Sequence, residues 1–204
     1  MEITLSLILG YLLGTLSPAA FFGKRKHVNL KETGTKNLGA SNATIVLGRS
    51  YGAIVMAVDI LKAYFAGKIA KWLFPHLVVE GYLAGFAAIL GHVFPFYMHF
   101  QGGKGLAAFG GMVCFHSPWL LLFYLTVGVA LMLLVNYSVF LPLFGAVTFP
   151  IIVLVQTGDM GIFLVSLAAG ILVAWRHWEN IGKIRRGEET PVRQVFATKV
   201  FKNK

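Results

Sequence analysis

Residues 91–111 read GHVFPFYMHFQGGKGLAAFGG, and the interpretation of the whole chain depends on this stretch. Its centre is a glycine-rich turn at residues 102–105 that holds Lys104, the only Lys or Arg in residues 72–175. Glycines let backbone N–H groups approach a ligand closely, and the apolar residues from Leu106 onward predict a helix whose N-terminus carries partial positive charge. Together with the Lys104 ammonium, these features predict an anion site, most naturally for phosphate.

Two further interpretations of the turn have to be considered. It is not a Walker A loop, because its first glycine stands too close to the Gly-Lys pair and Leu106 occupies the position of the Ser or Thr that would hold magnesium. The alternative to an anion site is a flexible turn between membrane helices, with a lysine that extends to the membrane surface. Both an anion site and such a turn agree with these four residues.

The composition is that of a polytopic membrane protein. Of the 204 residues, 57% are apolar and 13% are charged, and the mean hydropathy is +0.73. We therefore predict an all-α fold in which residues 1–204 form a single integral-membrane domain. The first helix has no basic segment before it, so we expect a retained transmembrane helix rather than a cleaved signal peptide. The single cysteine, Cys114, excludes an internal disulfide and a cysteine-based zinc site.

The net charge of +10 is concentrated in two segments. Residues 24–49 hold six of the eighteen Lys and Arg, and residues 176–204 hold eight. In a soluble protein such segments would suggest nucleic acid, but in a membrane protein they indicate the cytoplasmic side. We therefore predict no nucleic-acid partner, an N-terminus outside, a basic cytoplasmic tail at residues 176–204, and attraction of both segments to anionic membrane lipid.

Seven apolar segments predict about seven transmembrane helices. The decisive break is His116-Ser117-Pro118, because one helix across it gives six crossings and places the C-terminal cations outside, whereas two helices give seven and keep them in the cytoplasm. The helix before the break spans only about 15 Å, so it has to be buried among neighbours or lie where the bilayer thins. The tail is predicted to form an interfacial helix or to be disordered. The segments are residues 5–23, 51–74, 78–96, 106–115, 119–135, 139–155 and 160–175.

Two ionisable residues lie on one face of the second predicted helix. Asp59 and Lys62 are three residues apart, which is helical spacing for side chains that meet. Charges at this depth are costly unless they are paired. We therefore expect either an ion pair between them or a polar cavity that both line.

The predicted topology gathers three polar stretches on one face of the membrane: residues 34–42, the turn at 102–105 and residues 176–180. They share small residues, hydroxyls and amides, which hold an oxyanion or a polyol without a permanent cofactor. Asn37 and Asn42 have a second interpretation as ordinary turn residues beside glycine.

Among the histidines, one is a candidate for acid–base chemistry and none forms a metal-binding set. His177 directly follows the last predicted helix and is interpreted either as a base or as a surface histidine. His92 and His99 are seven residues apart with no carboxylate beside them, so we predict no metal and no cofactor.

The three stretches resemble motifs of the bacterial integral-membrane acyl-phosphate:glycerol-3-phosphate acyltransferases, which place the first acyl chain on glycerol 3-phosphate in phospholipid synthesis. The first motif of that family reads Gly-Ser-Gly-Asn-x-Gly-Ala-Thr-Asn-x-x-Arg; the second joins Gly-His-x-x-Pro to Phe-Lys-Gly-Gly-Lys-Gly, and the third joins Arg-His-x-x-Asn-Ile to Gly-x-Glu. Residues 59–62 are also similar to the second helix of the family, and the resemblance covers nearly the whole chain in register. The matching residues are Gly34, Asn37, Gly39, Ala40 and Asn42, with hydroxyls kept at Thr35 and Ser41; Gly91, His92, Pro95, Phe100, Gly102, Gly103, Lys104 and Gly105; and Arg176, His177, Glu179, Asn180, Ile181, Gly187 and Glu189.

The chain departs from the family pattern at three positions. Ile45 stands where the family has an Arg, Lys36 replaces a Gly, and Gln101 replaces a Lys. An isoleucine does not form the bidentate contact that a guanidinium makes with an oxyanion. Weak activity, an altered acceptor and a non-catalytic lipid- or phosphate-binding relative therefore stay open. A small anion transporter is a further alternative, although the chain has no internal repeat of the kind many transporters carry.

The resemblance implies a reaction: transfer of a fatty acyl group from acyl phosphate to glycerol 3-phosphate at the cytoplasmic face of the bacterial inner membrane, giving lysophosphatidic acid. In this reaction Lys104 and the amides of the turn bind a substrate phosphate, Asn180 positions the acceptor, and either His177 or the departing phosphate takes the hydroxyl proton. Thr35 and Asn37 help to order the first loop around the acyl phosphate. The implied catalytic residues are Thr35, Lys104, His177 and Asn180, and the implied substrate-binding residues are Asn37, Ser41, Asn42, His92, Gly102, Gly103, Lys104 and Gly105.

Overall fold

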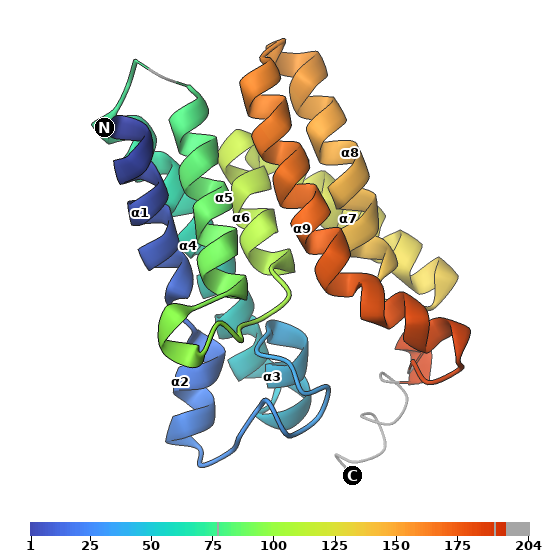
Figure 1. The fold of residues 1–204 in the computed structure, drawn as a ribbon. Coiled ribbons are helices and arrows are strands. Elements are labelled where there is room, and N and C mark those ends of the chain that lie inside the picture. The colour runs from blue at the N-terminus through green and yellow to red at the C-terminus, as the bar shows by residue number, and fades with distance from the viewer. Residues whose placement is uncertain (77, 190, 195–204) are drawn as a thin grey trace.

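A computed structural model describes residues 1–76, 78–189 and 191–194, and within these ranges all regular secondary structure is helical. This confirms the predicted all-α class (Figure 1). The helices are α1 (Glu2–Thr15), α2 (Pro18–Arg25), α3 (Ala40–Val46), α4 (Arg49–Leu73), α5 (Val79–Val93), the 3₁₀ helix η1 (Phe96–Met98), α6 (Leu106–His116), α7 (Pro118–Val135), α8 (Phe140–Thr157) and α9 (Met160–Arg185).

Five stretches of the described chain are long and apolar enough to cross a membrane: Glu2–Arg25, Val79–Met98, Pro118–Val135, Phe140–Thr157 and Met160–Arg185. The two other predicted crossings differ from these in composition or length. Helix α4 has 25 residues but carries five charged side chains, and α6 is apolar but has only 11 residues. The structure therefore supports a multi-pass membrane protein, while the count of seven crossings stays a prediction.

The predicted break after the sixth helix is present. Helix α6 ends at His116, and Ser117 begins α7 by accepting the N–H of Leu120 with its hydroxyl at 3.3 Å. Pro118 takes the first position of α7, where its missing N–H costs no hydrogen bond. The local signals that predicted the break are the ones that produce it.

Two predicted helix boundaries were wrong. The expected helix at residues 5–23 is divided into α1 and α2 at Leu16, because Ser17 caps a new helix whose first residue is Pro18. At the other end, the helix expected to stop at residue 175 continues to Arg185, so the first ten residues of the predicted tail extend α9. Residues 190 and 195–204 of that tail lie outside the described part of the chain.

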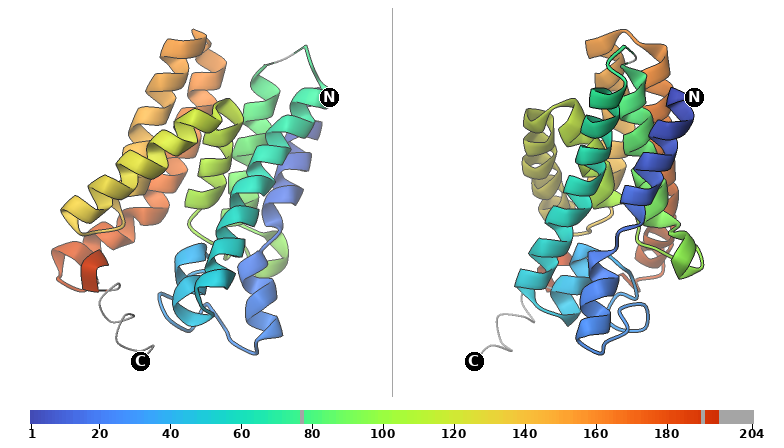
Figure 2. Two further views of the ribbon diagram at one scale, coloured as in Figure 1. Left: turned by 180° about the vertical axis from the view of Figure 1, so that it is seen from behind. Right: turned by 90° about the vertical axis from the view of Figure 1, so that its left-hand side faces the viewer.

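The helices pack as two groups (Figures 1 and 2). Helix α5 lies against α1 and α4, and α4 also packs along α6. The second group is centred on the α8–α9 pair, which contacts the first group through α5 and α6, with α7 beside α6 and α8. Short helices α2 and α3 lie at the end of the molecule opposite the N-terminus, the same end as the loop before α6 and the C-terminal half of α9. That end therefore carries all three polar motifs.

The contact between α1 and α5 is unusually close. A Cβ at Gly10 would overlap the backbone of Ala84, and one at Gly14 would overlap the backbone of Ala88. Small residues spaced four apart let two membrane helices approach until their backbones touch. This approach brings the end of α1 beside the end of α5, where the polar site begins.

Candidate functional site

One side chain, Asn42, organises the first polar loop. It lies at the start of α3 and is fully buried. Its amide oxygen accepts the N–H of Thr35 at 2.7 Å. Its amide nitrogen donates to the carbonyls of Leu30, Thr33 and Asn37 at 2.8, 3.1 and 2.9 Å. The interpretation of Asn42 as a turn residue therefore agrees with the structure, and its predicted contact with substrate remains untested.

The other predicted residues of this loop are more open. The side chains of Thr35 and Ser41 are exposed and that of Asn37 is partly buried. Lys36 is exposed at a positive φ of 56°. Ile45 lies on α3 with 39% of its surface exposed, so an apolar side chain occupies this part of the loop surface.

The glycine-rich turn is tied to the end of α5. The N–H of Gly102 donates to the carbonyl of Val93 at 2.9 Å, and the N–H of Gly103 donates to that of His92 at 3.1 Å. These two amides are therefore not available to a ligand, which corrects the prediction that all the amides of the turn bind phosphate. The N–H groups of Lys104 and Gly105 have no partner among the described residues. Gly105 has a φ of 86° and caps α6, so these free amides lie at the N-terminus of that helix.

The turn lies beside the first loop. A Cβ on Gly103 would be 2.7 Å from the carbonyl oxygen of Leu38. Leu38 belongs to the first loop, where it lies between Asn37 and Gly39 in the sequence. Leu38 itself is buried in a small apolar cluster with Met98 against its edge. Packing of this cluster therefore holds the first and second motifs together.

Lys104 connects the turn to α9. Its ammonium donates to the amide oxygen of Asn180, whose amide nitrogen donates to Glu189 at 2.9 Å. This arrangement assigns the orientation of the Asn180 amide, since a carboxylate only accepts. Burial lowers the pKa of Lys104, and the negative charge of Glu179 partly opposes that effect. The structure thus brings the second and third motifs into direct contact.

His177 is held in one tautomer. Only 8% of the residue is exposed, so the interpretation as a surface histidine is wrong. Its Nδ1 lies 2.8 Å from the carbonyl oxygen of Val173, one turn earlier on α9. A carbonyl accepts, so Nδ1 carries the hydrogen and Nε2 keeps a lone pair. That geometry suits a proton acceptor.

Arg176 is a candidate site residue that the sequence analysis matched to the third motif but did not count among the catalytic or substrate-binding residues. Its Nη2 donates to the carbonyl of Gly103 over a long 3.4 Å. Its Nε is buried without a partner among the described residues. A buried donor with no acceptor is costly, and an incoming anion would satisfy it. Its place in the third motif could have identified Arg176 from the sequence, but the contact of its guanidinium with the turn depends on tertiary packing.

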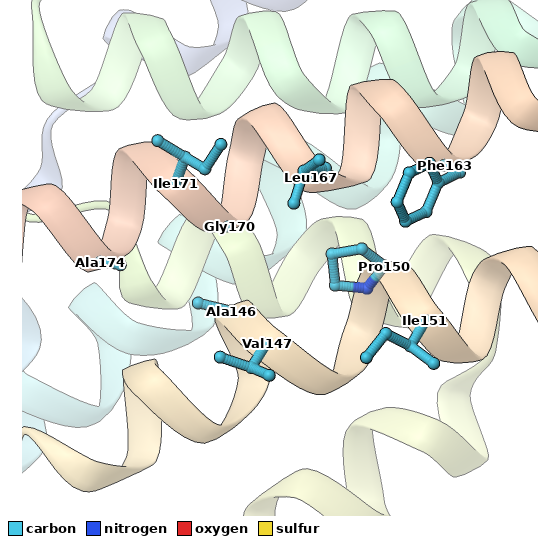
Figure 3. Close-up of a pocket in the computed structure, with 9 residues that line it drawn as sticks. All are labelled: Ala146, Val147, Pro150, Ile151, Phe163, Leu167, Gly170, Ile171 and Ala174. Carbon is cyan, nitrogen blue, oxygen red and sulfur yellow. The ribbon is translucent and has the colours of Figure 1, made fainter.

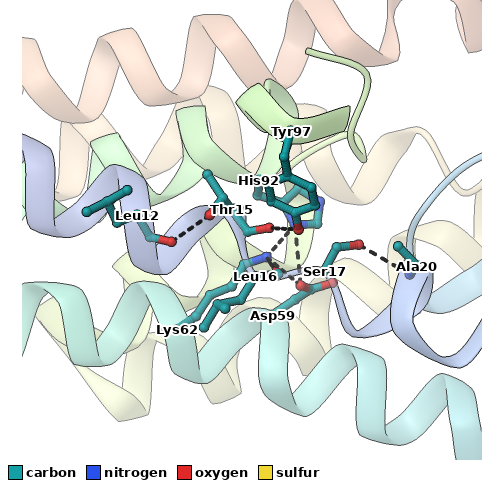
Figure 4. A network of polar contacts seen from close by, with 9 residues as sticks. All are labelled: Leu12, Thr15, Leu16, Ser17, Ala20, Asp59, Lys62, His92 and Tyr97. Atoms are coloured by element: carbon teal, nitrogen blue, oxygen red, sulfur yellow. Dashed lines mark hydrogen bonds and ion pairs between the residues drawn. The ribbon is translucent and has the colours of Figure 1, made fainter. Parts of the chain in front are cut away.

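Asp59, Lys62 and His92 form a buried group of ionisable residues (Figure 4), which adjoins the turn through the contact of His92 with Gly103. Lys62 Nζ lies 2.7 Å from Asp59 Oδ1 and 2.8 Å from His92 Nδ1. The interpretation of Asp59 and Lys62 as a pair is confirmed. Within the described ranges, no three His, Cys, Asp or Glu side chains gather as a metal site.

Comparison with known proteins agrees with this geometry. A family model described as glycerol-3-phosphate acyltransferase matches residues 4–187. The chain is 36% identical over 194 residues to a glycerol-3-phosphate acyltransferase of Coxiella burnetii, covering 95% of this chain and all of the relative. It is 33% identical over 195 residues to that of a Thermoanaerobacter species, covering 95% and 98%.

Solved structures give the same answer. A crystal structure of PlsY (YgiH), an integral membrane glycerol 3-phosphate acyltransferase in its glycerol 3-phosphate form, superposes with a TM-score of 0.86 at 30% identity, covering 94% of this chain and 96% of that one. The lysophosphatidic acid form gives a TM-score of 0.85 at 29% identity, covering 94% and 95%. With matching motifs, matching fold and similarity along nearly its whole length, this chain belongs to the glycerol-3-phosphate acyltransferase family of integral membrane proteins.

Proposed function

We propose that this protein transfers a fatty acyl group from acyl phosphate to glycerol 3-phosphate and releases lysophosphatidic acid and phosphate. The observation that carries the proposal is the contact between Lys104 of the turn and Asn180 of α9, with His177 three residues before Asn180 on the same helix. It places an anion-binding group next to a group that binds hydroxyls and next to a proton acceptor. Family membership supports the same reaction.

The chemistry needs few protein groups. Acyl phosphate is a mixed anhydride and is already activated, so a glycerol hydroxyl attacks its carbonyl carbon directly, without a covalent enzyme intermediate. The new carbon–oxygen ester bond forms as the bond from the carbonyl carbon to the phosphate oxygen breaks. The hydroxyl proton passes either to Nε2 of His177 or to the departing phosphate.

The site offers a distinct role to each motif. Lys104, Arg176 and the free amides at the start of α6 bind the phosphate of glycerol 3-phosphate, because they supply charge and unpartnered donors at one place. Asn180, oriented by Lys104 and Glu189, positions the acceptor hydroxyls. Thr35 and Asn37 help to order the first loop around the acyl phosphate.

A groove between α8 and α9 suits the acyl chain. It has a volume of about 320 Å³, and the residues that line it come from both helices (Figure 3). Ala174 lies at one end, one turn of α9 before His177. An acyl chain in this groove would enter from lipid and bring its carbonyl carbon toward the polar residues. The lining residues are Ala146, Val147, Pro150, Ile151, Phe163, Leu167, Gly170, Ile171 and Ala174.

We place the protein in the bacterial inner membrane with seven crossings, the N-terminus outside and the site at the cytoplasmic face. Helix α4 is long enough for a crossing, and pairing of Asp59 with Lys62 lowers the cost of its charges. Helix α6 is short but largely buried, as a half-length crossing requires. Seven crossings put both basic segments on one side of the membrane.

The direct test is transfer of palmitate from palmitoyl phosphate to glycerol 3-phosphate by the purified protein in detergent. We expect turnover, and we expect Lys104→Ala to lower kcat/KM by about tenfold to a hundredfold, the range for losing a charged hydrogen bond. Lys24→Ala, on an exposed lysine outside the site, serves as the control and should retain activity. Absence of turnover in folded protein would refute the proposal for this acceptor, and phosphate flux in proteoliposomes without acyl transfer would favour an anion transporter.

The second candidate is a catalytically weak or inactive relative, and the observation that favours it is the isoleucine at position 45. Because Ile45 is 39% exposed on α3, an arginine fits there without burying a charge. We expect Ile45→Arg to raise kcat/KM about tenfold by adding a guanidinium for an oxyanion. Ile45→Gln is the matched control, because it introduces a polar side chain without a charge. Equal activities of the Arg and Gln variants would show that no guanidinium is missing from this position.

A further inference from the structure

We propose that Asp59, Lys62 and His92 are positioning residues that hold the turn at residues 102–105 in its phosphate-binding shape, an inference that rests on the proposed function. The three side chains come from α4 and α5 and point toward one another (Figure 4), and the ring of His92 lies next to Gly103 of the turn. Only 1%, 5% and 7% of these residues is exposed, respectively. Among the described residues, no hydrogen bond or ion pair joins any of the three to Lys104 or Asn180, so they act through the turn rather than on the reacting atoms.

Lys62 is the centre of the cluster. Its ammonium donates to Asp59 Oδ1 at 2.7 Å, to His92 Nδ1 at 2.8 Å and to the carbonyl of Leu16 at 2.7 Å. An ammonium has three N–H groups, and all three are used. Lys62 is therefore fixed in position by three different segments of the chain.

The third of these contacts exists because α1 stops at Leu16. The N–H of Ala20, which would bond the Leu16 carbonyl in a continuous helix, donates to the hydroxyl of Ser17 at 3.3 Å instead. The freed carbonyl lies at the negative end of α1, where a cation is favourable. The helix break thus provides an acceptor for Lys62 inside the bundle.

The cluster assigns the state of His92. Since Nδ1 accepts from the ammonium, the hydrogen of the neutral imidazole lies on Nε2. Asp59 Oδ1 is 3.3 Å from the same Nδ1, and the ammonium donates to both of these acceptors. The ring of His92 is therefore held in one orientation by the charge pair.

His92 in turn sets the position of Gly103. The backbone carbonyl of His92 accepts the N–H of Gly103 at 3.1 Å, and Nε2 is so near that a Cβ on Gly103 would overlap it. Gly103 is followed directly by Lys104, and its own carbonyl accepts from Arg176. A rotation of the His92 ring would therefore shift both phosphate-binding cations.

Stability alone does not account for the cluster. Replacing a buried ion pair by apolar residues is often neutral or stabilising, because desolvation offsets the Coulomb attraction. In a membrane helix the cost of the two charges is greater still. The role of this charge pair is therefore to hold the phosphate-binding turn in position.

The test compares folded variants in the palmitoyl phosphate assay and in equilibrium binding of glycerol 3-phosphate. The double variant Asp59→Asn/Lys62→Met removes both charges together, so no unpaired charge is left buried. We expect it to raise KM and Kd for glycerol 3-phosphate by about tenfold, with KM for palmitoyl phosphate unchanged within twofold.

A second pair of variants probes the acceptor at Nδ1. Asn has an oxygen where His92 has Nδ1, so His92→Asn keeps the contact with Lys62, whereas His92→Leu removes it. We expect the Asn variant to recover most of the affinity for glycerol 3-phosphate that the Leu variant loses. Tyr82→Phe is the control, because it removes a partly buried 2.6 Å hydrogen bond to His116 near the other end of α5. It should lower thermal stability without changing either KM.

The outcomes separate this inference from the proposed function. If wild-type protein shows no turnover, the proposed function fails, and the binding measurements still test the cluster. Folded cluster variants that bind glycerol 3-phosphate within twofold of wild type would overturn the inference. A rise in KM for both substrates equally, or equal affinities of the Asn and Leu variants, would also contradict it.

Discussion

Lys104 is subject to two opposing effects at the scale of a single residue. Burial among the turn and α9 disfavours its ammonium and lowers its pKa, while Glu179 favours the charged form. The burial effect is the larger of the two, so the lysine loses its proton at a lower pH than a free lysine. Its capacity to bind phosphate is therefore lost at a lower pH than that of a free lysine.

We predict a basic limb in the pH profile of kcat/KM for glycerol 3-phosphate. The ammonium is present below the pKa of Lys104 and is lost as the pH rises through that lowered value, so KM for glycerol 3-phosphate should rise there. Lys104→Arg keeps its charge throughout, because a guanidinium does not deprotonate in this range. The limb should be missing in this variant, even if its activity is lower. An identical limb in both proteins would assign it to another group.

At the scale of elements, the contact between α1 and α5 positions the residues behind the site. Gly10 and Gly14 allow the two backbones to touch, and that contact places the end of α1 beside His92. Tyr11 reinforces it by donating its hydroxyl to the carbonyl of Phe94 at 2.8 Å. Spacing these helices further apart would separate Leu16 from Lys62.

We predict that Gly14→Ala destabilises the protein. The added methyl would overlap the backbone of Ala88, which is not free to move as a side chain is, and overpacking of this kind costs about 1–3 kcal/mol. Gly110→Ala on α6 is the matched control, because its nearest neighbours would lie 3.5 and 3.9 Å away. Alanine favours a helix over glycine, so the control should be as stable as wild type or more so. Thermal unfolding in detergent measures both, and equal melting temperatures would refute the close contact.

At the scale of the whole molecule, topology determines whether the three motifs share one side of the membrane. The described chain places the first loop, the turn and the end of α9 at one end of the bundle, away from the N-terminus. A shared end corresponds to one side of the membrane only if α4 and α6 both cross.

Single-cysteine labelling in a Cys114→Ser background tests this topology. We predict that Lys36→Cys reacts with an impermeant thiol reagent only after cells are opened, and that Met160→Cys at the start of α9 reacts in intact cells. Both positions are exposed, so accessibility within the fold does not limit either reaction. Labelling of both in intact cells would leave an even number of crossings between them and contradict the seven-crossing arrangement.

The sequence by itself determined the helical membrane class, the break at His116-Ser117-Pro118 and the motifs that form the site. Each of these depends on local chemistry: hydropathy over a helix length, a proline that lacks an N–H, and residue types at fixed spacing. The division of the first helix at Leu16 and the extension of α9 to Arg185 were missed, because hydropathy continues past Leu16 and falls after residue 175.

Only the tertiary structure decided which polar groups are free and which are already used. The N–H groups of Gly102 and Gly103 donate to carbonyls at the end of α5, and the side-chain amide of Asn42 bonds the backbone of its own loop. Lys62 forms a hydrogen bond with His92, thirty residues away. Arg176 becomes a site residue because α9 packs beside the turn. These partners are distant in sequence, and their hydrogen bonds form only once the helices have packed, so no local pattern predicts them.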